Sequence, residues 1–276
     1  MTVTALDRDN FNGNLWDPDR SYTLIAEALD SDPLLAALTT LPTSRATVGF
    51  PHADMTGADW VAELGAIPSM SMNDTVPVIA PAKLAGKFLM SSESLDDTDF
   101  PLAQFIRAAI STSVVRKAAR DVVYGVAGQP AAPAGFFGGL TNVAEATLRA
   151  SVVKACASLI RSHGKPTTVI LSPELWEAEV NRREALSVPS AGADGLFSDL
   201  GLTTRMSPAL DPADALVLDT SKCYKVLRRD VRIMSSNLTS EAWNSDATSV
   251  RVVARIAGAV PRPAEAARSI SVDTTP

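Results

Sequence analysis

The feature that most constrains this chain is one long amphipathic segment, residues 98–125. Thr98 or Asp99 can cap the free amide groups at its start, and Pro101 suits the first helical turn. Gly125 suits a left-handed helix end. Apolar residues recur every three or four positions and form one stripe, made of Leu102, Phe105, Ile106, Ala109, Ile110, Val114, Ala118 and Val122. The pattern predicts a helix roughly 40 Å long, long enough to be the spine of the fold.

The composition narrows the class of protein. With 46% hydrophobic and 20% charged residues, the chain of 276 residues is typical of a globular protein with a core. It has no apolar run of the roughly 18 residues that a membrane span needs, and no signal pattern at its start. A net charge of −6 argues against a dedicated nucleic-acid binder. Cys156 and Cys223 are interpreted as reduced core residues, which indicates the cytosol.

The first 45 residues are predicted to be an arm. Seven acidic side chains oppose three arginines here. Short helices are expected from Ser21 to Leu29 and from Pro33 to Leu38. Because helices this short are unstable alone, we expect them to dock either on this chain or on a neighbouring one.

Residues 60–92 predict a long β-hairpin. Two apolar runs, 60–67 and 76–91, flank a polar tip at 68–74. Pro77 and Pro81 cannot donate hydrogen bonds to a ladder, so the second arm must be an edge or leave the sheet. A two-stranded ribbon is marginal in water, so we expect the hairpin to lie on another surface.

The second half of the chain alternates helices with short strands, which favours an α/β or α+β fold. A loop is expected at 129–139, followed by an amphipathic helix that starts at Thr141 or Asn142 and ends near Arg161. A helix is expected to begin at Ser172, Pro173 and Glu174. Strands are expected at 167–171, 216–218, 223–227 and 250–259.

No group of residues predicts catalysis, a metal site or a cofactor site. His52 and His163 are the only histidines, and neither has metal-ligand spacing. Nucleophile-elbow and phosphate-loop motifs are absent from the sequence. Ser172 is explained by helix capping. An acidic cluster (Glu93, Asp96, Asp97 and Asp99) is explained as a solvated turn before a helix. We therefore predict that the chain is not an enzyme.

Two motifs resemble the major capsid proteins of tailed bacteriophages. The first is WVAELGAIP, from Trp60, and the second is KLAGKFLMSSESLDDT, from Lys83. In the second, Ser94 replaces the apolar residue that is usual in the family. Weaker similarities follow in the family's order: a loop with Pro133 and Gly135, SPELWEAEV at 172–180, LVLDTSKCYKVLRRDVRIM at 216–234, and a last strand containing Arg255. The resemblance covers about residues 46–270.

This resemblance implies the α+β Johnson fold, with an N-terminal arm (1–45), an extended loop and peripheral domain with the spine helix (46–140), an axial domain (141–219), and a return to the peripheral domain (220–276). It also implies a shell subunit that forms hexamers and pentamers of an icosahedral head around double-stranded DNA, without sequence-specific binding. The acidic net charge suits such a shell. We expect localisation in the virion and assembly in the host cytoplasm. Portal, decoration and scaffolding proteins are candidate partners, and any scaffold is expected to be a separate protein.

The resemblance also implies intersubunit contacts. The residues that we predict to make them are Trp60, Glu63, Met70, Met72, Val76, Val78, Arg107, Arg116 and Arg120. Some relatives join subunits by an isopeptide bond from a lysine on the extended loop. Residues 67–81 contain no lysine, and Lys83 and Lys87 lie near the base of the loop, so we predict a non-covalent shell.

Two alternatives remain open on the sequence alone. An encapsulin-type nanocompartment shell has the same fold and encloses cargo enzymes instead of a genome. A cytosolic α/β enzyme with an unrecognised site belongs to a different class. Rings or closed shells seen by electron microscopy would exclude the enzyme, and neighbouring terminase and portal genes would favour the phage capsid over the nanocompartment.

Overall fold

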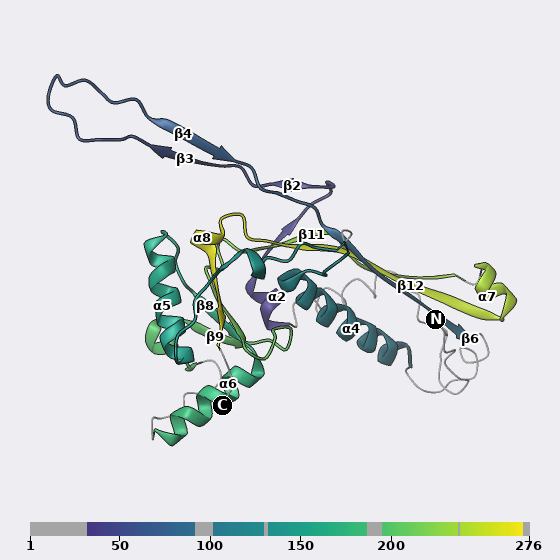
Figure 1. Ribbon diagram of the computed structural model, residues 1–276. Coiled ribbons are helices and arrows are strands. Elements are labelled where there is room, and N and C mark those ends of the chain that lie inside the picture. Colours follow the sequence, from purple (N-terminus) through teal and green to yellow (C-terminus); the bar gives the residue numbers. More distant parts are fainter. Residues whose placement is uncertain (1–31, 92–101, 130–131, 187–194, 237, 273–276) are drawn as a thin grey trace.

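The computed structural model describes residues 32–91, 102–129, 132–186, 195–236 and 238–272. Two β-sheets with helices packed on them form the body, and a hairpin projects far from it (Figure 1). The mixture of helices and antiparallel and parallel strands confirms the predicted α+β class. Among the described residues, no helix combines the length and the apolar character needed to cross a membrane.

The long helix α4 (Leu102–Tyr124) confirms the predicted spine. It runs below one sheet (Figure 1) and buries Ala119 and Val122 completely. Its predicted start at 98–101 lies outside the described residues. Gly125 ends it with φ +72°, as the sequence predicted. A side chain at Gly125 would lie 2.7 Å from the carbonyl oxygen of Ala134, so a close backbone contact also requires glycine here.

The first sheet has the order β1-β11-β12-β6. β1 is parallel to β11, and the other pairs are antiparallel. Its strands are β1 (Thr39–Pro42), β6 (Ala82–Ser91), β11 (Tyr224–Ser236) and β12 (Ala247–Ala259). The predicted strands 223–227 and 250–259 are therefore parts of longer ones. The charged run from Arg228 to Asp230 interrupts the apolar pattern and hides the continuation of β11.

The described end of the predicted arm packs on its own chain. In α2 (Pro33–Ala37), Leu34 and Leu35 are fully buried. Asp32 caps α2 by accepting a hydrogen bond from the Leu34 amide at 2.9 Å. The same carboxylate also accepts a hydrogen bond from the Ser207 hydroxyl at 3.2 Å. β1 then extends the first sheet. Of the two docking alternatives, α2 therefore uses this chain. The helix predicted from Ser21 lies outside the described residues.

The second sheet has the order β7-β13-β10-β8-β9. Its strands are β7 (Thr141–Asn142), β8 (Thr168–Leu171), β9 (Thr203–Met206), β10 (Asp214–Leu218) and β13 (Ala267–Ser271). Helices α5 (Leu148–Arg161) and α6 (Pro173–Ala185) bury Leu159 and Leu175 in the core beside this sheet. The short elements are α7 (Ser240–Asn244), α8 (Pro263–Ala266), η1 (Phe137–Gly139) and η3 (Ser198–Leu200).

Two predicted helix starts had different outcomes. The start of α6 is confirmed, because the Ser172 hydroxyl accepts a hydrogen bond from the Leu175 amide at 3.3 Å. The start of α5 at Thr141 or Asn142 was wrong. Those residues form β7, and the Asn142 side chain accepts a hydrogen bond from the Ser271 amide at 3.1 Å. Thr147 is the actual N-cap, accepting from the Ala150 amide at 3.2 Å.

The hairpin exists, but its predicted arms were partly wrong. Its outer ladder pairs β3 (His52–Thr56) with β4 (Ser71–Thr75), and its inner ladder pairs β2 (Val48–Gly49) with β5 (Val78–Ile79). Residues 60–67, predicted as the first arm, instead lie in the tip. Leu64 has φ +66°, which interrupts an extended strand. Because β3 and β4 are solvated on both faces, they lack the apolar pattern by which strands are usually predicted.

Pro77 and Pro81 fall at breaks in the hairpin's ladders, as expected. Pro77 lies between β4 and β5, and Pro81 lies between β5 and β6. The Pro77 carbonyl still accepts a hydrogen bond from the Phe50 amide at 3.0 Å. The prolines therefore lie between the ladders, where a residue without an amide hydrogen interrupts no strand.

Candidate intersubunit surface

The hairpin is a two-stranded ribbon that stands clear of the body (Figure 1). Within its outer ladder Met55 pairs with Met72, and the Thr56 and Ser71 hydroxyls are 2.9 Å apart. Every residue of β4 is exposed. Among the described strands, none pairs with this outer ladder as a third strand, and a ribbon of two strands gains little stability in water. The outer part of the ribbon is therefore a candidate for contacts outside this subunit.

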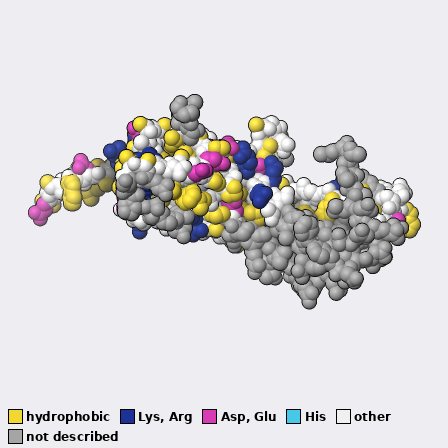
Figure 2. Space-filling view, turned by 90° about the horizontal axis from the view of Figure 1, so that it is seen from below, with side chains coloured by type: hydrophobic (Ala, Val, Ile, Leu, Met, Phe, Trp, Pro, Cys, Tyr) yellow, Lys and Arg dark blue, Asp and Glu magenta, His cyan; other side chains and the backbone are white. Residues whose placement is uncertain are grey.

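The tip of the hairpin carries large apolar side chains in full contact with solvent. Trp60 is 100% exposed, Leu64 103% and Ile67 87%. Figure 2 shows hydrophobic and acidic side chains where the hairpin extends from the body at the left. Clusters of exposed large apolar side chains mark protein–protein contact sites. This tip is consequently the strongest candidate for an interface in the part of the chain that the structure describes.

The predicted contact residues of the hairpin are all exposed. Trp60 and Glu63 lie in the tip, and the others follow along the second arm: Met70, Met72, Val76 and Val78. Leu64 and Ile67, which are also exposed, were not among the predicted contact residues. Gly65 directly follows Leu64 and Pro68 directly follows Ile67, and these loop-favouring neighbours were the signal for an exposed tip.

The predicted contact residues of the spine helix differ in their surroundings. Arg120 forms an ion pair with Asp211 at 2.8 Å and lies 5.3 Å from the centre of the Tyr124 ring. The Tyr124 hydroxyl donates to Asp214 at 2.7 Å. Arg120 therefore helps to join α4 to the second sheet of its own chain. Arg116 is exposed, and the Arg107 side chain lies outside the described residues.

A chain of ion pairs holds the outer ladder of the hairpin to the body. Asp54 pairs with Arg262 at 3.2 Å, Arg262 with Glu265 at 2.9 Å, and Glu265 with Lys222 at 2.8 Å. The hydrogen bond from Lys222 is the main reason why the pKa of Glu265 is lowered. These contacts join residues far apart in the chain, so no sequence spacing predicts them.

An aromatic contact adds to this anchor. The rings of Phe50 and Tyr224 stack with their centres 5.4 Å apart. Phe50 lies between β2 and β3, and Tyr224 is the first residue of β11. The hairpin therefore contacts the body of its own subunit at two places, through Asp54 and through Phe50.

Ser172 and the two cysteines are the residues whose reactivity the structure allows to be judged. Besides capping α6, the Ser172 hydroxyl donates to the Pro212 carbonyl at 2.8 Å. Burial raises the pKa of the Cys156 thiol to about 11 and, with a contribution from Asp219, that of Cys223 to about 12. Both free thiols are therefore protonated at neutral pH and are weak nucleophiles. Among the described residues, no group of three or more His, Cys, Asp or Glu side chains is arranged to hold a metal ion.

Comparison with solved structures identifies the fold. The chain is similar to a structure from Mycobacterium phage Adephagia, with 19% identity, a TM-score of 0.74, and coverage of 88% of this chain and 90% of that one. A structure from Microbacterium phage Oxtober96 has 18% identity, a TM-score of 0.73, and coverage of 88% and 91%. The capsid of a native GTA particle has 14% identity, a TM-score of 0.71, and coverage of 99% and 96%. These likenesses confirm the predicted capsid fold.

Comparison with sequences identifies the family. No curated protein matches the chain. The model of the phage capsid family matches residues 12–178, more than half of the chain, and includes the spine helix and the whole hairpin. This match favours the capsid interpretation over the nanocompartment and enzyme alternatives. The chain belongs to the phage capsid family.

Proposed function

We propose that this chain is the major capsid protein of a tailed phage, and that it assembles as hexamers and pentamers into an icosahedral head around double-stranded DNA. The observation that carries this proposal is the anchored hairpin with its solvent-exposed apolar tip. A subunit that fixes such a ribbon in one direction leaves it for a neighbouring copy to cover. The role is structural and not catalytic.

Burial of the hairpin on a neighbour is the expected source of assembly energy. Each large apolar side chain that becomes fully buried contributes about 1.5–3 kcal/mol. We assign this role to the apolar residues among the predicted hairpin contacts, namely Trp60, Met70, Met72, Val76 and Val78, and extend it to Leu64 and Ile67. Glu63 is proposed as a polar contact of the same surface. Arg107 and Arg116 are proposed as further contacts from α4. Arg120 is proposed to support the contact surface through Asp211 and to reach a neighbour with its exposed half.

The proposed domain division follows the expected boundaries, with a peripheral part around α4 and the first sheet and an axial part at 141–219. The net charge of −6 suits a shell that encloses DNA without holding it tightly. Portal, decoration and separate scaffolding proteins are proposed partners. Assembly is proposed to occur in the host cytoplasm, and the mature protein to reside in the virion.

The test is the assembly state of the purified chain. We expect negative-stain electron microscopy to show rings or closed shells, either of the chain alone or after addition of its scaffold. Light scattering across a concentration series should show the matching increase in mass. Compact monomers at every concentration, with and without scaffold, would contradict the proposal.

A further inference from the structure

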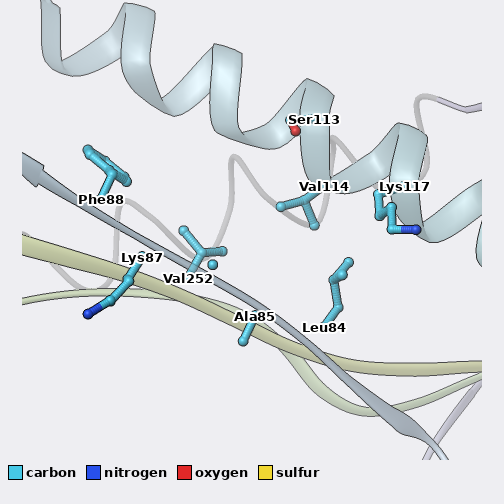
Figure 3. Close-up of a pocket in the computed structure, with 9 residues that line it drawn as sticks. Leu84, Ala85, Lys87, Phe88, Ser113, Val114, Lys117 and Val252 are labelled. Carbon is cyan, nitrogen blue, oxygen red and sulfur yellow. The ribbon is translucent and has the colours of Figure 1, made fainter. Parts of the chain in front are cut away.

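A groove runs between α4 and β6, on the side of the first sheet that α4 covers. Its wider part is a cavity of about 390 Å³, and a second cavity of about 270 Å³ continues it toward the end of α4. Both cavities are lined by Leu84, Ala85 and Lys117, so they form one groove. Figure 3 shows Val114 on α4 facing Leu84 and Val252 across the gap. We call this surface the spine groove.

The spine groove is open because β6 is an edge strand. Among the described strands, β6 pairs only with β12. Val252 and Ala118 are buried in the floor of the groove. Leu84, Phe88 and Val114 are only half-buried, although their apolar side chains line it. An apolar groove of this kind marks a place where another segment packs.

The arm of this chain contains a segment of matching character, the helix predicted from Ser21 to Leu29. Its apolar residues recur at intervals of three and four: Tyr22, Ile25, Ala26 and Leu29. In a helix these residues form one stripe, and Glu27 lies away from it. Nine helical residues are about 13 Å long, and β6 lines the groove over about 20 Å, from residue 82 to residue 88. The helix therefore fits along the groove.

The end of the arm is fixed close to the groove. α2, which follows the arm, packs in the same core cluster as Val115 and Ala118 of α4. The neighbouring residue Lys117 lines the groove. Three residue steps join Asp32 to Leu29 and reach about 10 Å, which is about the diameter of a helix. The arm can therefore pass α4 and enter the groove of its own subunit, at the high effective concentration that a short linker gives.

Charge favours the same placement. Residues 1–31 contain six acidic residues and two arginines, whereas residues 112–120 of α4 contain three basic residues and no acidic one. Lys117 is exposed at the rim of the groove. Residues 92–101, which join β6 to α4, are also acidic, but their only large apolar residues are Leu95 and Phe100. The arm is consequently the better match to an apolar groove with a basic rim.

We propose that residues 21–29 dock as a helix in the spine groove of their own subunit. The stripe that contains Ile25 covers Val114 and Leu84, and the acidic residues of the arm face the basic side of α4. The arm is thereby divided into two parts. Residues 21–42 belong to the body of their own subunit, and residues 1–20 are left for contacts with other copies.

Paired cysteines test this docking in a variant without the two native cysteines. Ile25→Cys with Val114→Cys should form a disulfide within one chain under mild oxidation, and mass spectrometry should find the linked peptides in monomeric protein. Glu27→Cys with Val114→Cys is the matched control, because Glu27 lies off the stripe. It should cross-link about tenfold more slowly, which corresponds to about 1.4 kcal/mol. Before oxidation, both variants should melt like their cysteine-free parent.

Equal cross-linking rates in the two variants would overturn the proposal. Linked dimers without linked monomers would also overturn it, since the groove would then hold the arm of a second copy. The disulfide is formed within one subunit, so the result does not depend on whether the chain assembles into shells.

Trypsin cleavage after Arg20 gives a second measurement on the chain with its native cysteines. Ile25→Asp places a charge in the docked stripe, so the arm should be released and cleaved about tenfold faster than in the wild type. Thr23→Asp adds the same charge off the stripe and should be cleaved like the wild type. Equal cleavage of the two variants would show that the stripe is not buried and would overturn the proposal.

Discussion

Asp54 and Arg262 are 208 positions apart in the chain, yet their side chains are 3.2 Å apart. Asp54 lies in the outer ladder of the hairpin, and Arg262 lies directly before α8. Arg262 is held in turn by Glu265, which Lys222 also contacts. The pair therefore ties the direction of the projecting ribbon to the body of the subunit. Partly exposed pairs contribute only about 0–1 kcal/mol, so its role is orientation more than stability.

The first prediction is that Asp54→Asn loosens the hairpin without unfolding the subunit. Spin labels at Ala66 in the tip and at Lys165 in the body, in a variant without the native cysteines, report the distance between them. The distance distribution should broaden in Asp54→Asn, while the melting temperature stays nearly unchanged. Asp74→Asn is the control, since it removes an equal charge from the partner strand. Equal distributions in both variants would show that the ion pair does not orient the hairpin.

The second prediction concerns the end of the spine helix. A non-glycine residue in the left-handed conformation costs about 1–2 kcal/mol. Gly125→Ala should lower the free energy of unfolding by more than this, because the new methyl group would lie 2.7 Å from the Ala134 carbonyl oxygen. Gly128→Ala is a matched control: its φ is +74°, and no atom lies within 4 Å of the added carbon. Urea unfolding of both variants checks the difference. Equal losses would mean that the close contact with Ala134 is unimportant.

The third prediction concerns pH. Burial alone raises the pKa of Glu179, but hydrogen bonds and charges from Arg182 and Arg183 outweigh it, so the net pKa is lowered. A carboxyl with a lowered folded-state pKa stabilises the fold above its unfolded-state pKa, near 4.5, and loses that effect as pH falls through the folded value. Stability should therefore fall below about pH 4.5.

The Glu179→Gln variant isolates this effect. Removing the buried charge should cost on the order of 3 kcal/mol at pH 7, and the remaining acid dependence should be smaller than in the wild type. Glu177→Gln, on the exposed side of the same helix, is the control. Urea midpoints at pH 7 and pH 4 give both quantities. An unchanged acid dependence in Glu179→Gln would exclude this carboxyl as its source.

The fourth prediction separates assembly from folding at the hairpin tip. Trp60→Ala with Leu64→Ala should leave the melting temperature of the unassembled subunit unchanged, because neither side chain is buried in it. The same variant should assemble poorly, since it loses about 1.5–3 kcal/mol for each side chain that a neighbour buries. Ile160→Ala is the control, because Ile160 is 61% exposed on α5, outside the proposed contact. Normal shell formation by the tip variant would contradict the assigned role.

Much of the body was predictable because its signals are local. The spine helix, the cap at Ser172 and the left-handed turn at Gly125 each follow from residues within a few positions of each other. The outer ladder was not predictable in the same way. β3 and β4 are exposed on both faces, so they carry no apolar alternation, whereas the apolar residues that resembled a strand form the tip.

The hairpin part of the candidate surface was predictable from the sequence. The exposed apolar residues of the hairpin stand in one continuous stretch of sequence, so Trp60, Met70 and Met72 were found. A row of basic residues across the first sheet, in contrast, depends on register: Lys83, Arg255 and Arg229 come from three strands, and only their pairing places them side by side. Nothing in the spacing of these residues indicates that row.

The last prediction concerns how the shell is held together. Residues 46–82, which include the whole projecting ribbon, contain no lysine. Lys83 and Lys87 lie within β6, where their backbone is paired with β12 across the first sheet. Neither amine stands on the part of the hairpin that extends toward a neighbour, so an isopeptide bond from the hairpin has no nucleophile. We therefore expect mature particles, boiled and reduced, to give one band near 29.1 kDa on a denaturing gel. A ladder of multimers would show that covalent bonds join the subunits, and mass spectrometry of the ladder would then identify the lysine involved.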